Sequence, residues 1–410
     1  MALDLIIRGA RIPDAPGRVD LGVRDGRLVR IGAPVRDTGT QELDVGGRLV
    51  IPGLVESHFH LDKALLGAGA PADAGSVAGA IRATAEMKRR FTREDIAARA
   101  RRALELAIRH GTTAMRTHVE VDPIVGLMGM EAILPLKREY AWAIDLQICV
   151  FPQEGILQAK GTEALMRRAL AMGGEVVGGV PYNDTDPLAH LDLVFDLARE
   201  FDRDVDLHLD FADDADRLLV GDVADRTIGR GWRGRVCAGH MSALGALVPD
   251  ALAPVVTKIR EAGISILVLP ATDLYLMGRN DVRNVRRGLA PARRLHDAGV
   301  NVAVSTNNVQ NPFTPFGDAS LLRMANFYAN VAHAAVSEFD TCLDLVTDLP
   351  ARLMNLKDYG ITIGNPADLI VLDTDSGRNA IAELPDVLTG FKNGRQVFER
   401  SRPVLFPPQA

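Results

Sequence analysis

The sequence predicts an α/β protein with a (β/α)8 barrel of the TIM type and a small β-sandwich domain built from both termini. Three observations support this prediction. Eight short apolar runs recur through the middle of the chain. Most are separated by segments with apolar residues at three- and four-residue spacing, as amphipathic helices require. Both ends of the chain instead alternate apolar residues with glycine-containing turns, which is typical of strands.

The two ends of the chain share a sequence pattern that is typical of strands. It is seen at the start in "LDLIIRGARIPD", "GRVDLGVRDGRLVRIG" and "QELDVGGRLVIPG", and it returns in "ADLIVLDTDSG" and "VLTGFKNGRQVFER". We therefore expect residues 1–50 and 357–410 to form one composite β-sandwich domain, and residues 51–356 to form the barrel.

The apolar runs of the middle region follow one another in strand–helix units. Several of the helical segments end in glycine directly before the next run, which is a helix-stop signal. Eight such units predict a closed parallel barrel, whose active site lies at the carboxyl ends of its strands. The runs are "LVIPGLVESHFH", "TTAMRTHVEV", "DLQICVFPQ", "EVVGGVPY", "DVDLHLDF", "RVCAGHMS", "ISILVLPAT" and "VNVAVSTNNV".

Composition restricts the possible partners. The chain has 410 residues and a net charge of −6, so its main partner is not expected to be a nucleic acid or an anionic membrane surface. No apolar run approaches the ~20 residues of a membrane-spanning helix. The three cysteines are widely spaced and form no CxxC motif, and the first residues lack the basic lead of a signal peptide. We expect a cytoplasmic protein that acts on a small molecule.

Histidines gather at the predicted strand ends. His58 and His60 end the first run, and residues i and i+2 of a strand point to the same side. His118 lies late in the second run, while His208 and His240 end the fifth and sixth. Two neighbouring imidazoles plus one from another strand would hold a metal and leave positions open for water. Chance surface histidines are the alternative, and His118 alone is better explained as a hydrogen-bonded core residue.

These motifs resemble the amidohydrolase superfamily, and more narrowly its cytosine deaminase branch, which includes N-alkylamino-triazine hydrolases. The resemblance covers nearly the whole chain. It implies a divalent metal held by His58, His60 and His208, with His240 beside the metal-bound water or substrate and Gln153 as a substrate contact. The motifs are "PGLVESHFHLDK", "GTTAMRTHVEV", "FPQEGIL", "DLHLDFADD", "CAGHMSA" and "NPFTPFGD". Because Lys63 is not at the strand-four position of a bridging lysine, the resemblance implies one metal ion.

Two residues depart from that family's pattern. Phe211 stands where cytosine deaminases carry a proton-shuttling glutamate, and Asn307 stands where they carry a metal-binding aspartate. Asparagine cannot take up a proton. The loss of a general base typically costs about 10²–10⁴-fold in rate. We therefore consider His240 as the base, with Asp62 and Asp210 as substitutes, although a structural hydrogen bond or ion pair is the commoner role for such carboxylates.

The sequence thus predicts a metal-dependent hydrolase that cleaves a C–N bond of a small N-heterocycle or cyclic amide. Without the two carboxylates the site would favour anionic or oxo-substituted substrates. The alternative is a barrel relative that binds such a ring without hydrolysing it. Zinc and iron both suit imidazole ligands, manganese is compatible, and the family is compatible with a homo-oligomer. We assign to catalysis His240, Asn307, Asp62 and Asp210, and to substrate contacts Gln153, Phe211, Lys63, Asn308 and Tyr182.

Overall fold

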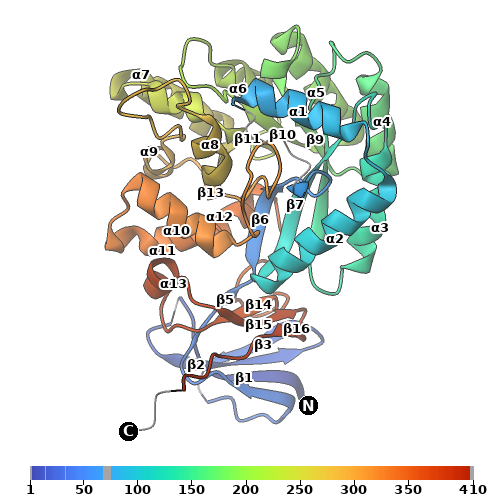
Figure 1. The fold of residues 1–410 in the computed structure, drawn as a ribbon. Helices are drawn as coiled ribbons and strands as arrows, with labels where there is room; N and C mark the ends of the chain where they lie inside the picture. Colours follow the sequence, from blue (N-terminus) through green and yellow to red (C-terminus); the bar gives the residue numbers. More distant parts are fainter. Residues whose placement is uncertain (1, 14, 33, 68–74, 407–410) are drawn as a thin grey trace.

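A parallel barrel forms the larger part of the protein (Figure 1). The computed structural model describes residues 2–13, 15–32, 34–67 and 75–406. Neighbouring strands of the barrel are hydrogen-bonded in chain order, and each of these pairs is parallel. The strands are Leu54–Phe59 (β6), Thr112–Glu120 (β7), Asp145–Phe151 (β8), Val176–Gly179 (β9), Asp204–Leu209 (β10), Val236–His240 (β11), Ile264–Val268 (β12) and Val302–Val304 (β13).

The last and first strands close the barrel through the segment that follows β13. The amide of Asn307 donates to the carbonyl of His58 at 2.9 Å, and the amide of His60 donates to the carbonyl of Asn307 at 3.2 Å. Every residue of β6 and β7 is buried, as expected for strands covered on both faces. The closed parallel sheet confirms the predicted barrel.

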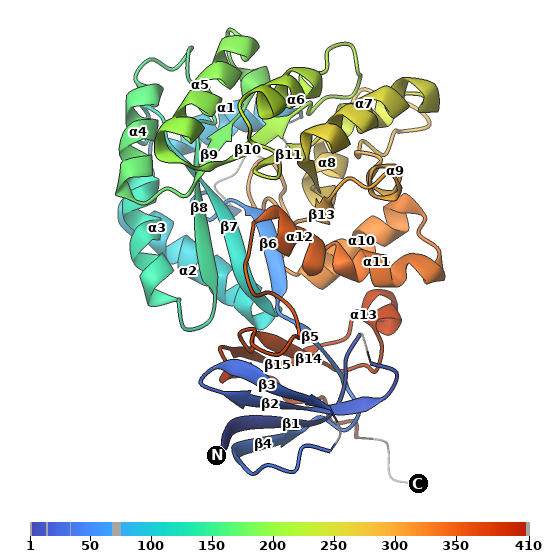
Figure 2. The ribbon, with the colours of Figure 1, turned by 180° about the vertical axis from the view of Figure 1, so that it is seen from behind.

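Helices surround the barrel strands (Figures 1 and 2). Among the described residues, no helix combines the length and apolar composition needed to cross a bilayer. Short 3-10 turns cover Pro181–Asn183, Ser242–Ala246 and Val336–Glu338. The α-helices are Val77–Lys88 (α1), Arg93–Arg109 (α2), Met128–Glu139 (α3), Thr162–Met172 (α4), Pro187–Phe201 (α5), Val220–Gly229 (α6), Pro249–Ala262 (α7), Pro270–Leu276 (α8), Ala292–Asp297 (α9), Leu321–Ala332 (α10), Phe339–Asp344 (α11), Asp348–Leu353 (α12) and Gly377–Glu383 (α13).

A second sheet contains strands from both ends of the chain, as predicted. Strand β5 pairs antiparallel with β14, so that Val50 lies opposite Val371. A separate apolar core that includes Leu21, Val50 and Phe391 joins the two sets of strands. The domain limits at residues 50 and 357 stay a prediction. The strands are Leu3–Arg11 (β1), Arg18–Arg24 (β2), Arg27–Gly32 (β3), Gly39–Asp44 (β4), Leu49–Pro52 (β5), Leu369–Leu372 (β14), Val387–Lys392 (β15) and Arg395–Glu399 (β16).

Candidate metal centre and active site

The three predicted ligands, His58, His60 and His208, meet at the carboxyl ends of β6 and β10. The Nε2 atom of His208 lies 3.2 Å from Nε2 of His58 and 3.3 Å from Nε2 of His60. Two ligand nitrogens bound to one tetrahedral zinc ion at 2.0–2.1 Å are separated by about 3.3 Å. The spacing of His208 to each partner therefore fits a shared ion.

The protonation state of these imidazoles fits the same purpose. Burial lowers the pKa of His58, His60 and His208 well below the usual value for histidine, so all three are neutral and keep a lone pair for a ligand. Their Nδ1 atoms are buried and have no hydrogen-bond partner among the described residues. An ion bound at Nε2 would leave these Nδ1 atoms unpaired, so the fit to a metal rests on the Nε2 spacing and on the neutral lone pairs. The three residues fit a divalent ion.

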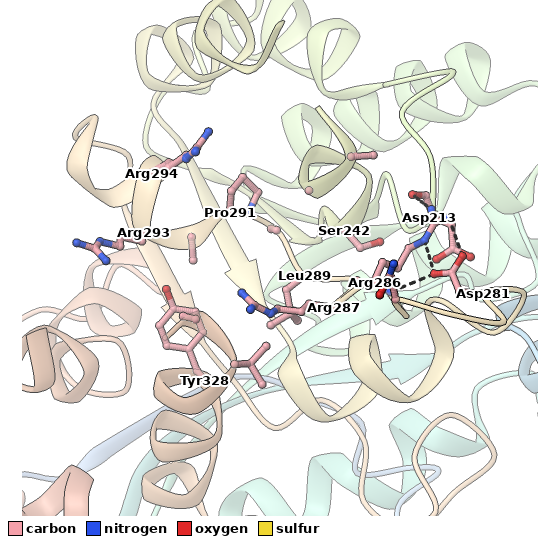
Figure 3. Close-up of a pocket in the computed structure, with 18 residues that line it drawn as sticks. Asp213, Ser242, Asp281, Arg286, Arg287, Leu289, Pro291, Arg293, Arg294 and Tyr328 are labelled. Atoms are coloured by element: carbon pink, nitrogen blue, oxygen red, sulfur yellow. Dashed lines mark hydrogen bonds and ion pairs between the residues drawn. The ribbon is translucent and has the colours of Figure 1, made fainter. Parts of the chain in front are cut away.

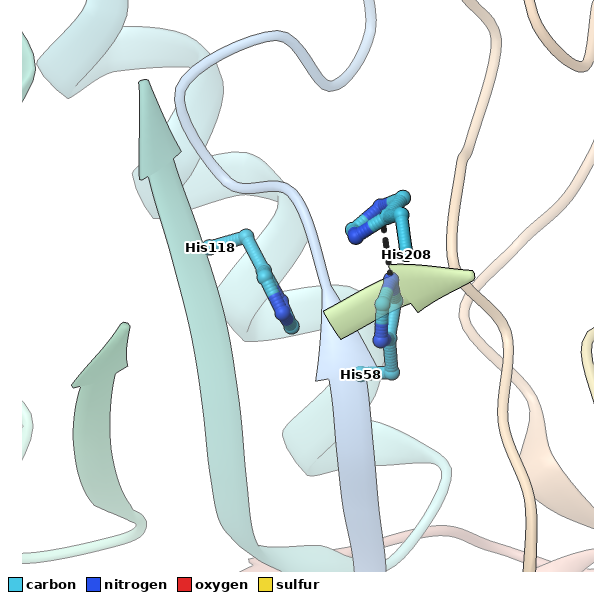
Figure 4. Close-up of side chains that lie close together, drawn as sticks. All are labelled: His58, His118 and His208. Carbon is cyan, nitrogen blue, oxygen red and sulfur yellow. Dashed lines mark hydrogen bonds between the residues drawn. The ribbon is translucent and has the colours of Figure 1, made fainter. Parts of the chain in front are cut away.

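His118 on β7 adds a fourth imidazole to the cluster (Figure 4). Ligand-capable nitrogens of His58, His118 and His208 lie within 4.8 Å of one another. However, Nε2 of His118 lies 3.3 Å from the carboxylate of Asp206, within ion-pair distance but without a hydrogen bond. Nε2 of His60 lies 3.3 Å from Nε2 of His208 and forms no ion pair with a carboxylate among the described residues, so we retain His60 in the ligand set.

Asp206 is a buried carboxylate behind the histidines. Its Oδ2 accepts a 2.8 Å hydrogen bond from Arg116, and its Oδ1 lies 3.8 Å from Nδ1 of His58. Although burial opposes ionisation, His118 and Arg116 hold the pKa of Asp206 well below its usual range. An ionised carboxylate beside Nδ1 favours the tautomer of His58 that leaves Nε2 free to bind a metal.

His240, at the end of β11, forms a pair with Asp273 on α8. Nδ1 of His240 lies 2.6 Å from Oδ1 of Asp273, which is fully buried. Oδ2 of Asp273 accepts the amide of Leu269, so the carboxylate is fixed on both sides. The ring of Phe211 stacks on His240 with centroids 3.8 Å apart. The arrangement fixes the imidazole and leaves its Nε2 without a hydrogen-bond partner among the described residues.

The segment after β13 places Asn307 and Asn308 at the same rim. The side chain of Asn308 donates to Oδ1 of Asn307 at 2.8 Å and accepts a bond from Asn311. Nδ2 of Asn307 is buried and has no hydrogen-bond partner among the described residues. It is therefore a donor available to a bound molecule, whereas Asn308 is engaged on both sides of its amide.

Asp62 and Asp210 are engaged by backbone amides. Asp62 accepts the amide of Glu120 at 2.7 Å. The two carboxylate oxygens of Asp210 accept the amides of Leu219 and Val220, at the start of α6. This is the structural role that the sequence left open for both residues. Among the described residues, neither carboxylate forms a hydrogen bond or ion pair with the three imidazoles, so the geometry favours His240 over both as a base.

Lys63 and Gln153 lie next to each other in a buried network. Nζ of Lys63 donates to Gln153 at 3.0 Å and to Glu120 at 2.7 Å. Glu120, Asp122 and Glu154 form a second group of possible metal ligands. The ammonium of Lys88 already occupies that position, at 2.7, 2.7 and 2.8 Å from their oxygens. These residues form an ion-pair network beside the active site.

Replacing Lys88 by alanine is expected to lower the free energy of unfolding by about 3–5 kcal/mol, because the buried carboxylates of Glu120 and Asp122 and the partly buried Glu154 lose their common partner. Although burial opposes ionisation, Lys63 and Lys88 lower the pKa of Glu120 to about 2. The wild type should therefore keep this contribution above about pH 4.3 and lose it as the pH falls toward 2.

Urea unfolding between pH 3 and pH 8 would measure this loss of stability. Lys258→Ala is the control, because it breaks an exposed pair with Asp225 and should cost at most about 1 kcal/mol. Equal effects of the two variants would contradict the assignment.

Apolar side chains line one side of the site. Phe211, Phe313 and Met277 are buried in one cluster, and the partly buried Tyr182 and Tyr275 pack against it. Tyr182 lies in the 3-10 turn after β9, next to the strand that carries His208. A flat ring would be matched by such a wall, and the substrate contacts of Phe211 and Tyr182 stay a prediction.

Sequence reasoning missed three members of this site. Asp273, which lies on α8 and contacts His240, received no role in the sequence analysis. Asp206 and His118 were not assigned a role at the metal. The i, i+2 spacing of Asp206 and His208 on one strand, and of Arg116 and His118 on another, was the available signal.

Comparisons with known proteins were made over the whole chain. The model of the amidohydrolase family matches residues 41–143 and 132–398. N-isopropylammelide isopropyl amidohydrolase of Pseudomonas sp. (strain ADP) is 28% identical over 401 residues, which cover 96% of each chain. Pterin deaminase of Rhizobium rhizogenes is 28% identical over 86% of this chain and 82% of that protein. The crystal structure of 5-methylcytosine deaminase from Klebsiella pneumoniae with 5-fluorocytosine matches with a TM-score of 0.93 and 32% identity, covering 98% of this chain and 99% of that chain.

Proposed function

The chain belongs to the amidohydrolase family, and from this premise we propose that it is a metal-dependent hydrolase that cleaves a C–N bond of a small N-heterocycle or cyclic amide. One observation carries the proposal. The Nε2 atoms of His58 and His60 both lie within 3.3 Å of Nε2 of His208, at the end of the barrel where such enzymes do their chemistry. His58, His60 and His208 would hold the ion.

A divalent ion at this position would supply Lewis-acid polarisation of water or of a substrate oxygen. The remaining chemistry falls to this chain's own residues. Asp273 accepts the Nδ1 proton of His240, which leaves Nε2 as the nitrogen that can accept a proton. His240 takes a proton from the attacking water while the C–O bond forms. It returns the proton to the leaving nitrogen as the C–N bond breaks.

The substrate proposal follows from the charge of the site. Phe211 and Asn307 bring no carboxylate to the imidazoles, and the nearby Asp206 is paired with Arg116. A divalent ion among neutral imidazoles would leave a net positive site, which favours an anionic or oxo-substituted ring. The buried Nδ2 of Asn307 offers a donor to a ring oxygen, and Gln153 and Lys63 lie on the β8 side of the site.

The relatives support this class of substrate. The names of the three proteins refer to an alkylamino ring compound, a pterin and 5-methylcytosine. Because the chain lacks the carboxylates at 211 and 307, we propose that it differs from cytosine deaminases in the ring it accepts. Zinc and iron are the first candidates for the ion, and manganese is the next. Three buried free cysteines support a cytoplasmic location.

A screen of pyrimidines, triazines, hydantoins and cyclic ureas with metal-loaded protein tests the proposal. We expect about one equivalent of metal and chelator-sensitive hydrolysis of an oxo-substituted ring. Cytosine should be turned over at least about 10²-fold more slowly, because no carboxylate replaces the shuttle at Phe211. Brisk cytosine turnover would contradict the substrate proposal. Ring binding without metal or hydrolysis would support the alternative, a non-hydrolytic relative.

A further inference from the structure

A second pocket of about 690 Å³ opens between the segment 284–294 and helix α10 (Figure 3). None of the histidines of the metal centre lines it. Four arginines do, against two aspartates, Asp213 and Asp281. The arginines are Arg286, Arg287, Arg293 and Arg294. The pocket therefore carries more positive than negative side chains.

Arg286 lies between two of the aspartates in this region. Nε of Arg286 lies 2.8 Å from Asp281, and its Nη1 lies 3.0 Å from Asp214. Asp213 accepts the backbone amide of Gly278 at 2.8 Å. Figure 3 shows Arg286, Asp213 and Asp281 together on one side of the pocket. The ion pairs that these carboxylates form are with Arg286 alone, and none of the carboxylates forms a hydrogen bond or ion pair with Arg287 or Arg294 among the described residues.

Arg287 stands apart from this group and has no carboxylate partner among the described residues. Its Nη2 lies 2.8 Å from Nε2 of His333, within hydrogen-bond distance. Arg294 likewise forms no ion pair within the part of the chain that the structure describes, and Arg293 shares its charge with Glu338 at 2.8 Å. Five guanidinium donors allow Arg287 to hold His333 and a ligand at once.

Tyr328 on α10 supplies a second, independent indication of a ligand. Tyr328 is only 6% exposed, while its hydroxyl is not among the fully buried polar atoms and forms no hydrogen bond to another described residue, so it is open to the pocket. Figure 3 shows that hydroxyl and the Arg287 guanidinium directed into the same part of the pocket. Burial raises the pKa of Tyr328 to about 12, so the hydroxyl stays protonated and can donate.

We propose that this pocket binds a small phosphate monoester, with the phosphate between Arg287 and the Tyr328 hydroxyl and the organic part against Leu289, Pro291 and Val331. Guanidinium groups match the planar pairs of phosphate oxygens and form charge-assisted hydrogen bonds to them. A monoester carries close to two negative charges at neutral pH, which the unpaired Arg287 and Arg294 can balance. The pocket volume accommodates a sugar phosphate or a mononucleotide.

Isothermal titration of the full-length protein with ribose 5-phosphate and with adenosine 5′-monophosphate tests the proposal. Ribose and adenosine are the unphosphorylated controls. We expect Kd values below about 1 mM for both phosphates at low salt, weakening as salt screens the arginines. The binding needs neither the metal nor turnover, so its outcome is separate from that of the proposed hydrolase activity.

Matched variants locate the binding. Arg287→Gln should raise Kd at least about tenfold, and Tyr328→Phe about three- to tenfold, because each removes a donor to a charged oxygen. Arg283→Gln removes an exposed arginine directly before the segment 284–294 that does not line the pocket, and should leave Kd unchanged. The proposal fails if neither phosphate binds, if adenosine and ribose bind equally well, or if Arg283→Gln weakens binding as much as Arg287→Gln.

Discussion

The His208→Asn variant is expected to retain less than about a tenth of the wild-type metal and to lose about 10³-fold or more in kcat/KM. His208 is the residue whose Nε2 lies within 3.3 Å of both other proposed ligands, so its loss affects the whole set. Asparagine at this position keeps a polar side chain but removes the imidazole nitrogen. Metal analysis after gel filtration and steady-state kinetics on the best ring substrate would measure both effects.

His296→Asn is the matched control for this experiment. His296 lies on the short helix α9, away from the four clustered imidazoles. It should keep its metal and activity, and both variants should keep the wild-type circular dichroism. A His208→Asn variant that binds a full equivalent of metal and turns over normally would exclude the proposed ligand set.

The Asp273→Asn variant is expected to keep its metal and lose about 10²–10⁴-fold in kcat. The side-chain amide of the variant has no charged oxygen to accept the hydrogen bond from Nδ1–H of His240. Its NH2 group can instead donate to Nδ1 and select the opposite tautomer, so that Nε2 carries the proton. Because the substitution changes one atom type in a buried position, KM should move much less than kcat.

Asp273→Glu separates positioning from general damage. A carboxylate restored one methylene further out should recover part of the lost kcat, whereas a purely structural defect would not be rescued. Metal content is the second readout. Loss of metal together with kcat, or a wild-type kcat in Asp273→Asn, would show that Asp273 does not act through His240.

Much of the architecture follows from periodicity. The eight apolar runs correspond to β6 through β13, and the glycine at 111 directly precedes β7, as the helix-stop signal predicts. Alternation also identified the terminal strands. Here, an Asp25–Gly26 pair with φ values of 50° and 74° forms the turn between β2 and β3. These local features can be read from the sequence because the backbone geometry restricts which residues occur in turns and on buried faces.

The site was only partly visible for a physical reason. Strand-end position is enough to collect His58, His60, His208 and His240, since all barrel strands end at one rim. Pairing across the rim depends on loop geometry instead. Position alone did not identify Asp273 as the partner of His240. It also did not show that Asp210 accepts hydrogen bonds from two backbone amides at the start of α6.

The hydrogen bonds that close the barrel run through Asn307, His58 and His60. The eighth strand is only three residues long, so this seam has few other backbone bonds to hold it. Separation of β13 from β6 would therefore displace His58 and His60 relative to His208, which lies on the opposite side of the barrel. A ligand that bridges these imidazoles would stabilise the closed barrel, because its binding free energy is lost when the strands separate.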